Sequence, residues 1–153
     1  MDAKTKGFMS GLSLGVSTAI IIWFCLMLEW NVTHPPEPIS GRTGFSQALP
    51  VYWTASNSSE TITLTIMNNA RDKVKLNQVN VTVFGESLSG ETCNRNNIGK
   101  DLVPGENYTI NITGCAIPAI GELYKADMQI VYTNLKSNIS HNSVGECHGR
   151  VEN

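Results

Sequence analysis

The sequence predicts an all-β fold, an immunoglobulin-like antiparallel β-sandwich, preceded by one N-terminal transmembrane α-helix. Three observations lead to this prediction. Residues 8–28 contain no charged side chain and no histidine. Several short runs after residue 60 alternate apolar and polar residues, as half-buried strands do. Turn-forming pairs separate these runs, and long helical periodicity is lacking there, which favours a sandwich of short strands.

The uncharged stretch Phe8–Leu28 is long enough to cross a membrane. Its 21 residues would reach about 31 Å as a helix, which matches the hydrocarbon core of a bilayer. Lys4 and Lys6 precede the stretch and Glu29 follows it, and a positive flank favours the cytoplasmic side. We therefore expect residues 8–30 to form a single-pass helix in the cell membrane, with the N-terminus cytoplasmic and the C-terminal domain extracytoplasmic.

Three interpretations of this stretch remain open: a cleaved secretory signal, a plain anchor, or the start of a mature pilin-like chain. A secretory signal usually has a shorter apolar region and a cleavage site of small residues, and no clean site of this kind precedes Asn31. Residues 1–7 are then either a cytoplasmic tip or a prepilin-type leader. Such a leader would be cut between Gly7 and Phe8, although Leu12 stands where a glutamate is usual. The helix also carries a GxxxG pair, which permits close helix packing, at Gly11 and Gly15.

Residues 31–47 are predicted to be a linker and residues 48–153 an extracytoplasmic β-sandwich domain. The run His34–Pro38 contains three prolines, which fix the backbone and remove donors, so this part should be stiff and extended. Gly41 and Gly44 should loosen the chain before the domain begins.

The first two predicted strands follow the linker. Residues 61–66 alternate strictly, with three aliphatic side chains on one face. A second run starts at residues 74–76 and continues at 79–83 in the opposite phase. A β-bulge near Asn77 and Gln78 would explain this switch.

Three more strands are predicted towards the C-terminus. Residues 108–113 and 125–133 alternate in the same way. The last run, 144–151, places Gly145, Cys147, Gly149 and Val151 on one face. Residues 69–73 are predicted to be a hairpin tip, with Asp72 exposed. Turn signals separate the runs at Asn68-Asn69, Ser89-Gly90, Pro104-Gly105 and residues 134–137.

Two cysteines are predicted to form a disulfide bond. Cys93 is expected in a polar loop, and Cys115 follows the strand at residues 108–113. Since an outward domain lies in an oxidising environment, a Cys93–Cys115 bridge is expected. It would close a loop of about 22 residues and add about 3 kcal/mol of stability. Cys25, in the apolar stretch, is interpreted as an inert residue or as a lipidation site.

Cys147 has no expected partner. It is either a buried strand residue or a metal ligand together with His148 and His141 or His34. Adjacent strand residues point to opposite faces, so Cys147 and His148 would not easily hold one ion. We therefore predict no metal site and no cofactor.

Six Asn-x-Ser/Thr sequons are candidate N-glycosylation sites on an outward domain. Composition alone would give about two or three, as an estimate from residue content. The alternative is a polar strand rhythm that carries no sugar. Two of the sequons are too close together for all six to be used. The six asparagines are Asn31, Asn57, Asn80, Asn107, Asn111 and Asn138.

Charge and motifs argue against several function classes. The chain has 11 basic and 13 acidic side chains and a formal net charge of −2, and no basic patch suggests nucleic acid. No nucleophile, phosphate-loop or zinc-protease motif is found. Asp101 and Glu106 flank a turn, where acids are usually solvated. We therefore expect neither an enzyme nor a protein with a small-molecule substrate.

Several segments between residues 60 and 152 resemble archaeal type IV pilin-like surface proteins, which carry a class III signal peptide. The segments are residues 64–69, the strand at 79–83, Cys93, residues 104–106, residues 113–115, the strand at 124–133, His141 and residues 145–152. The resemblance implies an N-terminal helix that can polymerise, a β-sandwich head, and a role in pili, adhesion or the cell envelope.

Three functions are considered. The first is a membrane-anchored structural surface protein, a pilin-like subunit or minor pilin. It would contact the membrane and further copies or other pilin and envelope proteins, and as a pilin-like subunit it would stand in a surface filament. The second is a non-polymerising immunoglobulin-like binding module, anchored in the membrane, of the envelope or of an archaellum-type machine. The third is a subunit of a membrane enzyme complex.

Overall fold

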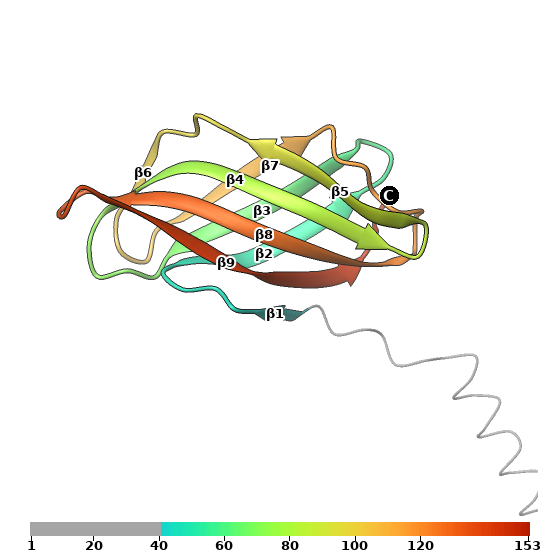
Figure 1. Cartoon of the computed structure of the whole chain (residues 1–153), viewed down its shortest axis with the longest axis horizontal. Helices are drawn as coiled ribbons and strands as arrows, with labels where there is room; N and C mark the ends of the chain where they lie inside the picture. The colour runs from blue at the N-terminus through green and yellow to red at the C-terminus, as the bar shows by residue number, and fades with distance from the viewer. Residues whose placement is uncertain (1–40) are drawn as a thin grey trace, which may run out of the picture. The chain divides into compact units, whose positions relative to one another are not determined.

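The computed structural model describes residues 41–153, which form two antiparallel β-sheets (Figure 1). In this part of the chain, no helix forms that is long and apolar enough to cross a membrane. Several predictions concern residues outside the described range. They are the leader junction Gly7–Phe8, the transmembrane helix 8–30 with Gly11 and Gly15, Cys25, Asn31, His34 and the proline-rich part of the linker.

The larger sheet has six strands in the order β1-β9-β8-β4-β5, and β6 pairs with β4 beside β5. These strands are β1 (Gly41–Thr43), β4 (Val74–Gly85), β5 (Leu88–Arg95), β6 (Lys100–Leu102), β8 (Leu123–Asn134) and β9 (Ile139–Arg150). The smaller sheet has the order β2-β3-β7. Its strands are β2 (Ala48–Ser56), β3 (Thr61–Asn68) and β7 (Asn107–Thr113). All strand pairings in both sheets are antiparallel, so the predicted all-β, antiparallel, sandwich-like architecture is confirmed.

The two sheets enclose one apolar core. Alternate residues of β3 and β4 are buried, as the sequence alternation predicts. Burying one large aliphatic side chain contributes about 1.5–3 kcal/mol, so the facing rows dominate the stability of the sandwich. The largest fully buried side chains include Ile62, Leu64, Ile66, Leu76, Leu102, Ile112, Met128 and Ile130.

The five predicted strands correspond to β3, β4, β7, β8 and β9. The β-bulge predicted near Asn77 and Gln78 is confirmed, because the pairing of β4 with β8 shifts register between Leu76 and Gln78. Cys147 of β9 and Val151, the residue just after this strand, are both buried, as the predicted inner face requires. This strand begins at Ile139, five residues before the predicted start. The earlier start was missed because the first residues of the strand are mostly polar and do not alternate with apolar ones.

Four strands were not predicted. β1, β5 and β6 carry few apolar side chains, and β2 is interrupted by a register shift between Pro50 and Tyr52. Residues 41–43, which were assigned to the linker, form β1 and pair with β9. The linker prediction is therefore wrong for these three residues.

The turn predicted at Ser89-Gly90 is also wrong, because both residues belong to β5. The pairing shifts between Val83 and Phe84, so Gly90 is an extra residue on β5. Its φ of +105° suits glycine, and a Cβ there would lie 2.7 Å from the ring of Phe84. The chain reverses instead between Gly85 and Leu88.

Residues 69–73 do not form the predicted hairpin tip. β3 belongs to the smaller sheet and β4 to the larger one, so these residues carry the chain from one sheet to the other. Alternation and turn residues look the same in both cases, which is why the sequence did not separate them. The crossover from β3 to β4 lies at one end of the sandwich (Figure 1).

Candidate functional surfaces

One seam between the sheets is closed by a disulfide bond. Cys93 of β5 and Cys115, just after β7, are bonded with a Cα–Cα distance of 5.1 Å. β5 lies at an edge of the larger sheet and β7 at an edge of the smaller one, so the bond joins the two sheets. The predicted pairing is confirmed, although Cys93 lies in a strand and not in a polar loop.

The opposite seam, between β2 and β9, is closed by hydrogen bonds. The indole Nε1 of Trp53 donates to the His148 carbonyl at 3.2 Å, and the Arg42 guanidinium donates to the Pro50 carbonyl. Three further contacts are made by Glu152 N to Ala55 O (2.8 Å), Asn57 N to Glu152 O (3.4 Å) and Ser46 N to Ser143 Oγ (2.9 Å). Residues near the two ends of the described sequence, around Arg42 and Glu152, therefore help to close this seam.

A cleft of about 230 Å³ opens at the hydrogen-bonded seam. Its lining includes Tyr52, Trp53 and Tyr124, with Arg150 and Glu152 at the same site. Burial, with smaller contributions from Cys147, Glu152 and Tyr52, raises the pKa of Tyr124 above its ordinary value. The Tyr124 phenol therefore stays protonated at neutral pH, and the cleft offers aromatic faces beside charges of both signs.

The outer face of the larger sheet carries a small charge cluster. Lys125 lies 3.0 Å from Asp127 and 3.3 Å from Glu146, and its ammonium lies 5.0 Å from the centre of the Phe84 ring. The hydrogen bond to Asp127, assisted by Glu146 and opposed by partial desolvation, raises the pKa of Lys125. These side chains are partly exposed and form ion pairs with one another, as surface charges commonly do.

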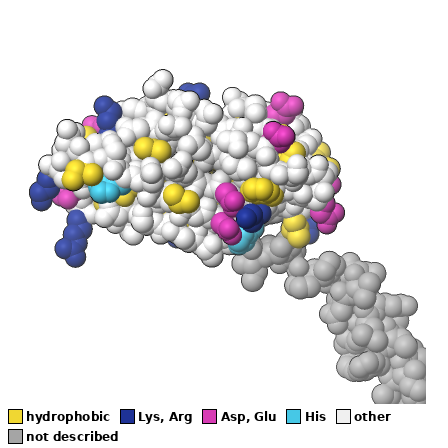
Figure 2. Space-filling model, viewed as in Figure 1, with side chains coloured by type: hydrophobic (Ala, Val, Ile, Leu, Met, Phe, Trp, Pro, Cys, Tyr) yellow, Lys and Arg dark blue, Asp and Glu magenta, His cyan; other side chains and the backbone are white. Residues whose placement is uncertain are grey.

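The outer face of the smaller sheet is polar but uncharged. Its central rows pair Thr61, Thr63 and Thr65 of β3 with Thr113, Asn111 and Thr109 of β7. Hydrogen bonds join two of the pairs, from Thr63 Oγ1 to Asn111 Oδ1 (3.1 Å) and between the hydroxyls of Thr65 and Thr109 (2.8 Å). Figure 2 views the molecule from the side of the larger sheet, where hydrophobic and charged side chains are scattered over the surface.

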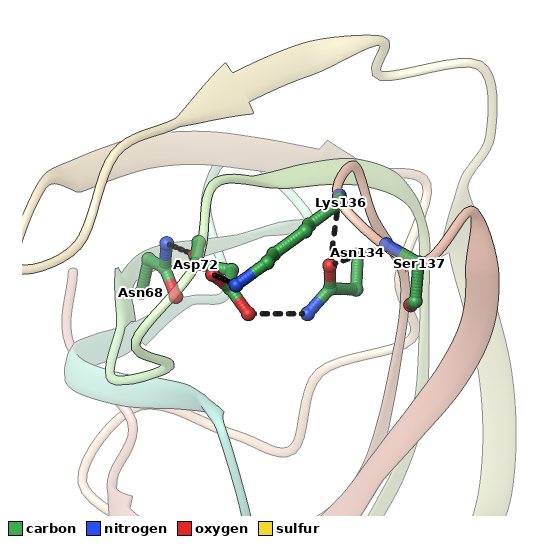
Figure 3. A network of polar contacts seen from close by, with 5 residues as sticks. All are labelled: Asn68, Asp72, Asn134, Lys136 and Ser137. Atoms are coloured by element: carbon green, nitrogen blue, oxygen red, sulfur yellow. Dashed lines mark hydrogen bonds and ion pairs between the residues drawn. The ribbon is translucent and has the colours of Figure 1, made fainter.

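A polar network fastens the crossover between β3 and β4 (Figure 3). The buried Asn68 amide donates to the carbonyls of Asp72 and Leu102, both at 3.0 Å, and accepts from Ala70 N. The Asp72 carboxylate accepts from Asn134 Nδ2 at 3.5 Å and lies 3.6 Å from the Lys136 ammonium. The residues predicted as a hairpin tip thus form a connection between the sheets that hydrogen bonds and an ion pair hold in place.

The two turn acids have structural partners as well. Asp101 pairs with Lys73 at 3.0 Å, and Glu106 pairs with Lys100 at 3.1 Å. The hydrogen bond from Val103 N and the contact with Lys100 lower the pKa of Glu106. Both acids are therefore paired surface groups.

Cys147 is a buried strand residue with a free thiol. Burial, opposed by nearby Arg42, raises its pKa to about 12. His141 instead stacks on the Tyr132 ring, with centroids 5.5 Å apart. Within residues 41–153, no three of the side chains of His, Cys, Asp and Glu are grouped so that they could hold a metal ion.

The five described sequon asparagines fall into two groups. The amides of Asn57 and Asn80 donate hydrogen bonds to other parts of the domain. Asn107, Asn111 and Asn138 are exposed. This division was not visible in the sequence, where all five look alike.

No known protein family and no curated protein matches the chain. Among solved structures, a Bordetella pertussis protein designated ApaA is similar over 76% of this chain and 98% of its own, with 12% identity and a TM-score of 0.46. A structural-genomics target protein is similar over 74% of this chain and 85% of its own, with 12% identity and a TM-score of 0.47. A Bacteroides uniformis beta-glucuronidase is similar over 68% of this chain but only 12% of its own, with 19% identity and a TM-score of 0.30. These scores are too low to carry an argument about function.

Proposed function

We propose that this chain is a membrane-anchored structural surface protein, a pilin-like subunit or minor pilin whose β-sandwich head lies outside the cell. The Cys93–Cys115 bond carries the outward placement, because structural disulfides persist in oxidising compartments and are rare in the cytosol. The uncharged residues 8–28 supply the single-pass anchor in this proposal, with Lys4 and Lys6 on the cytoplasmic side.

The head is proposed to be immunoglobulin-like in its finer topology. Along the chain, β2, β3 and β7 fall in one sheet and β4, β5, β8 and β9 in the other. This distribution supports the proposal because immunoglobulin-like sandwiches place the first, second and fifth strands in one sheet and the third, sixth and seventh in the other. The fourth main strand, β5, departs from the constant-type arrangement, since it lies in the sheet of β4 and not in that of β3. The disulfide departs from antibody domains, since it joins β5 to the segment after β7 and not two central strands.

Self-assembly is the part of the proposal that concerns the N-terminal region. The GxxxG pair at Gly11 and Gly15 would let copies of the helix approach closely. The resemblance to archaeal type IV pilin-like proteins supports removal of residues 1–7 and a filament. In this proposal the protein has a structural and not a catalytic role.

The cleft at the β2–β9 seam favours a second candidate, a non-polymerising binding module of the envelope or of an archaellum-type machine. Tyr52 is 53% exposed beside Arg150 and Glu152, and exposed aromatic and arginine side chains often anchor protein contacts. In this alternative the anchor is the same but the mature chain keeps residues 1–7.

Two measurements test the proposal. Protease treatment of intact cells should degrade the head, whereas a head that is protected until the cells are lysed would refute the outward placement. Mass spectrometry of the native N-terminus should give Phe8 for a pilin-like subunit. An intact N-terminus on a protease-accessible protein would reject the pilin and favour the binding module.

A further inference from the structure

The described sequons differ in whether their amide nitrogen is free to carry a sugar. We infer that Asn107, Asn111 and Asn138 are N-glycan acceptors, whereas Asn57 and Asn80 are structural amides that stay unmodified. This inference rests on the outward placement proposed above, because N-glycans are added to outward-facing domains. Beyond the proposed function, the inference specifies which asparagines carry a glycan and which surface of the domain the glycans cover.

Asn57 is committed to holding the fold together. Its Nδ2 donates to the carbonyls of Ile117 at 3.0 Å and Pro118 at 2.9 Å. A primary amide has two hydrogens, and both are used here. A glycan would replace one of them and place a bulky polar group against Pro118, which is buried. A chain modified at Asn57 could not form this junction between the β2–β3 turn and the segment after Cys115.

Asn80 is committed in a different way. It lies on β4, between β5 and β8, where its Nδ2 donates to Gln129 at 2.9 Å and its Oδ1 accepts from Gln78 at 2.6 Å. The residue is half-buried on the outer face of the larger sheet. A sugar here would have to displace Gln129 of the neighbouring strand β8 and disturb Gln78 on β4 itself.

Asn107 and Asn111 offer free nitrogens on the edge strand β7. Both are exposed, and neither Nδ2 makes a hydrogen bond among the described residues. Thr63 donates to the Asn111 oxygen at 3.1 Å, which fixes the amide while leaving its nitrogen open. The two positions share a face and lie four residues apart, about 14 Å along a strand. This spacing leaves room for two glycan stems, so the inference departs from the expectation that these two sequons are too close together for both to be used.

Asn138 lies in the turn between β8 and β9. It is exposed, with a φ of +57°, and its backbone N–H donates to the Asn134 carbonyl at 2.8 Å. The turn is thus held by backbone and by Asn134, and the Asn138 side chain has no part in holding it. A sugar at this position disturbs no contact of the described domain.

The modification requires a lipid-linked oligosaccharide with a phosphate or diphosphate leaving group as donor. The asparagine Nδ2 forms a bond to the anomeric carbon while the bond from that carbon to the phosphate oxygen breaks. The phosphate departs with the electron pair, and the amide loses one proton to the medium. The sugars on Asn107 and Asn111 would cover the uncharged face of the smaller sheet.

Glycopeptide mass spectrometry of the full chain, extracted from membranes of its native host, tests the inference. We expect sugar on Asn107, Asn111 and Asn138 and bare asparagine at Asn57 and Asn80. A bare residue among the first three, or sugar on either of the other two, overturns the assignment. Protease treatment of intact cells from the same culture separates the two proposals, because an accessible but sugar-free head would refute only the glycan assignment.

Paired variants separate an acceptor from a structural amide. Ser140→Ala destroys the Asn138 sequon and should lower the mass by one glycan. Ser59→Ala destroys the Asn57 sequon while keeping the Asn57 amide, so mass and thermal midpoint should both stay unchanged. Asn57→Gln should leave the mass unchanged and lower the midpoint. A mass loss in Ser59→Ala would overturn the structural assignment of Asn57, even if Asn57→Gln fails to fold.

Discussion

The two seams of the sandwich are closed by different chemistry. On one side the covalent Cys93–Cys115 bond joins β5 to the segment after β7. On the other side hydrogen bonds from Trp53 and Arg42 join β2 to the region of β9 and β1. The first seam depends on redox state and the second on hydrogen bonds between the sheets. The comparison teaches that the domain resists opening by two independent mechanisms, which substitutions can separate.

Removing the disulfide should have the largest effect. Cys93→Ala with Cys115→Ala releases a loop with a sequence separation of 22, and the free energy of unfolding should fall by about 3 kcal/mol. Urea unfolding followed by far-ultraviolet circular dichroism measures the change. A reducing agent should destabilise the unmodified protein and leave the double variant unaffected. Equal stability of the two proteins would show that the covalent seam is dispensable.

Substitution of Trp53 tests the hydrogen-bonded seam. Trp53→Phe removes the 3.2 Å bond to the His148 carbonyl and should cost about 1–2 kcal/mol, since that partner is left without its donor. Tyr52→Phe is the matched control, because it removes one polar atom from an exposed side chain of the same strand. The same urea series should show no loss for the control. If the two variants are equally stable, packing and not hydrogen bonding closes this seam.

Alkaline pH should weaken the sheet at the same seam. Cys147 lies on β9, and burial raises its pKa from 9.0 to about 12. Above pH 9 the unfolded chain releases this proton before the folded chain does, so stability falls as pH rises from 9 towards 12. At pH 10 the loss should be about 1 kcal/mol.

The pH dependence is measured from thermal midpoints between about pH 8 and about pH 10. The expected loss of stability at the upper pH is about 1 kcal/mol. Cys147→Ala should flatten the decline, although the buried Tyr124, whose pKa is also raised, keeps a weaker slope at higher pH. An unchanged slope in Cys147→Ala would exclude the thiol as the cause.

A surface ion pair away from both seams should have the smallest effect. Lys73→Met breaks the 3.0 Å pair with Asp101, whose side chains are 49% and 42% exposed. Exposed pairs of this kind contribute about 0.2–1 kcal/mol, and salt screens them. The difference from the unmodified protein should shrink further in 1 M salt, a condition in which the Debye length is about 3 Å. A loss as large as that of Trp53→Phe would mean that this corner, and not the seams, controls opening.

The sequence predicted those parts of the fold that alternate around a buried row. β3 and β8 have an apolar residue at every second position, and even the bulge of β4 was visible as a phase switch at Asn77. β5 escaped prediction because an edge strand with a bulge at Gly90 buries only Cys93 well. The membership of β3 and β4 in different sheets was hidden too, since a crossover and a hairpin can use the same turn residues.

The candidate site was only partly predictable. The Cys93–Cys115 pairing could be predicted from the oxidising environment and the small number of cysteines. The cleft near Tyr52 could not, because it is lined by strands that are far apart in the sequence and come together only in the folded sandwich. Likewise, Asn57 and Asn138 carry the same three-residue signal, and only the carbonyls facing Asn57 distinguish them. Long-range contacts of this kind leave no trace in a short motif.

The short strand β1 has a mechanical consequence. A pull on the chain ahead of Gly41 reaches the domain at three residues paired with β9, so β1 should detach first under load. The disulfide lies far along the chain from that point and would be reached only after β2 and β3 have yielded. Residues 93–115, about 75 Å of extended chain, then stay locked, and the reach of the stretched protein is shortened by that length while the bond is oxidised.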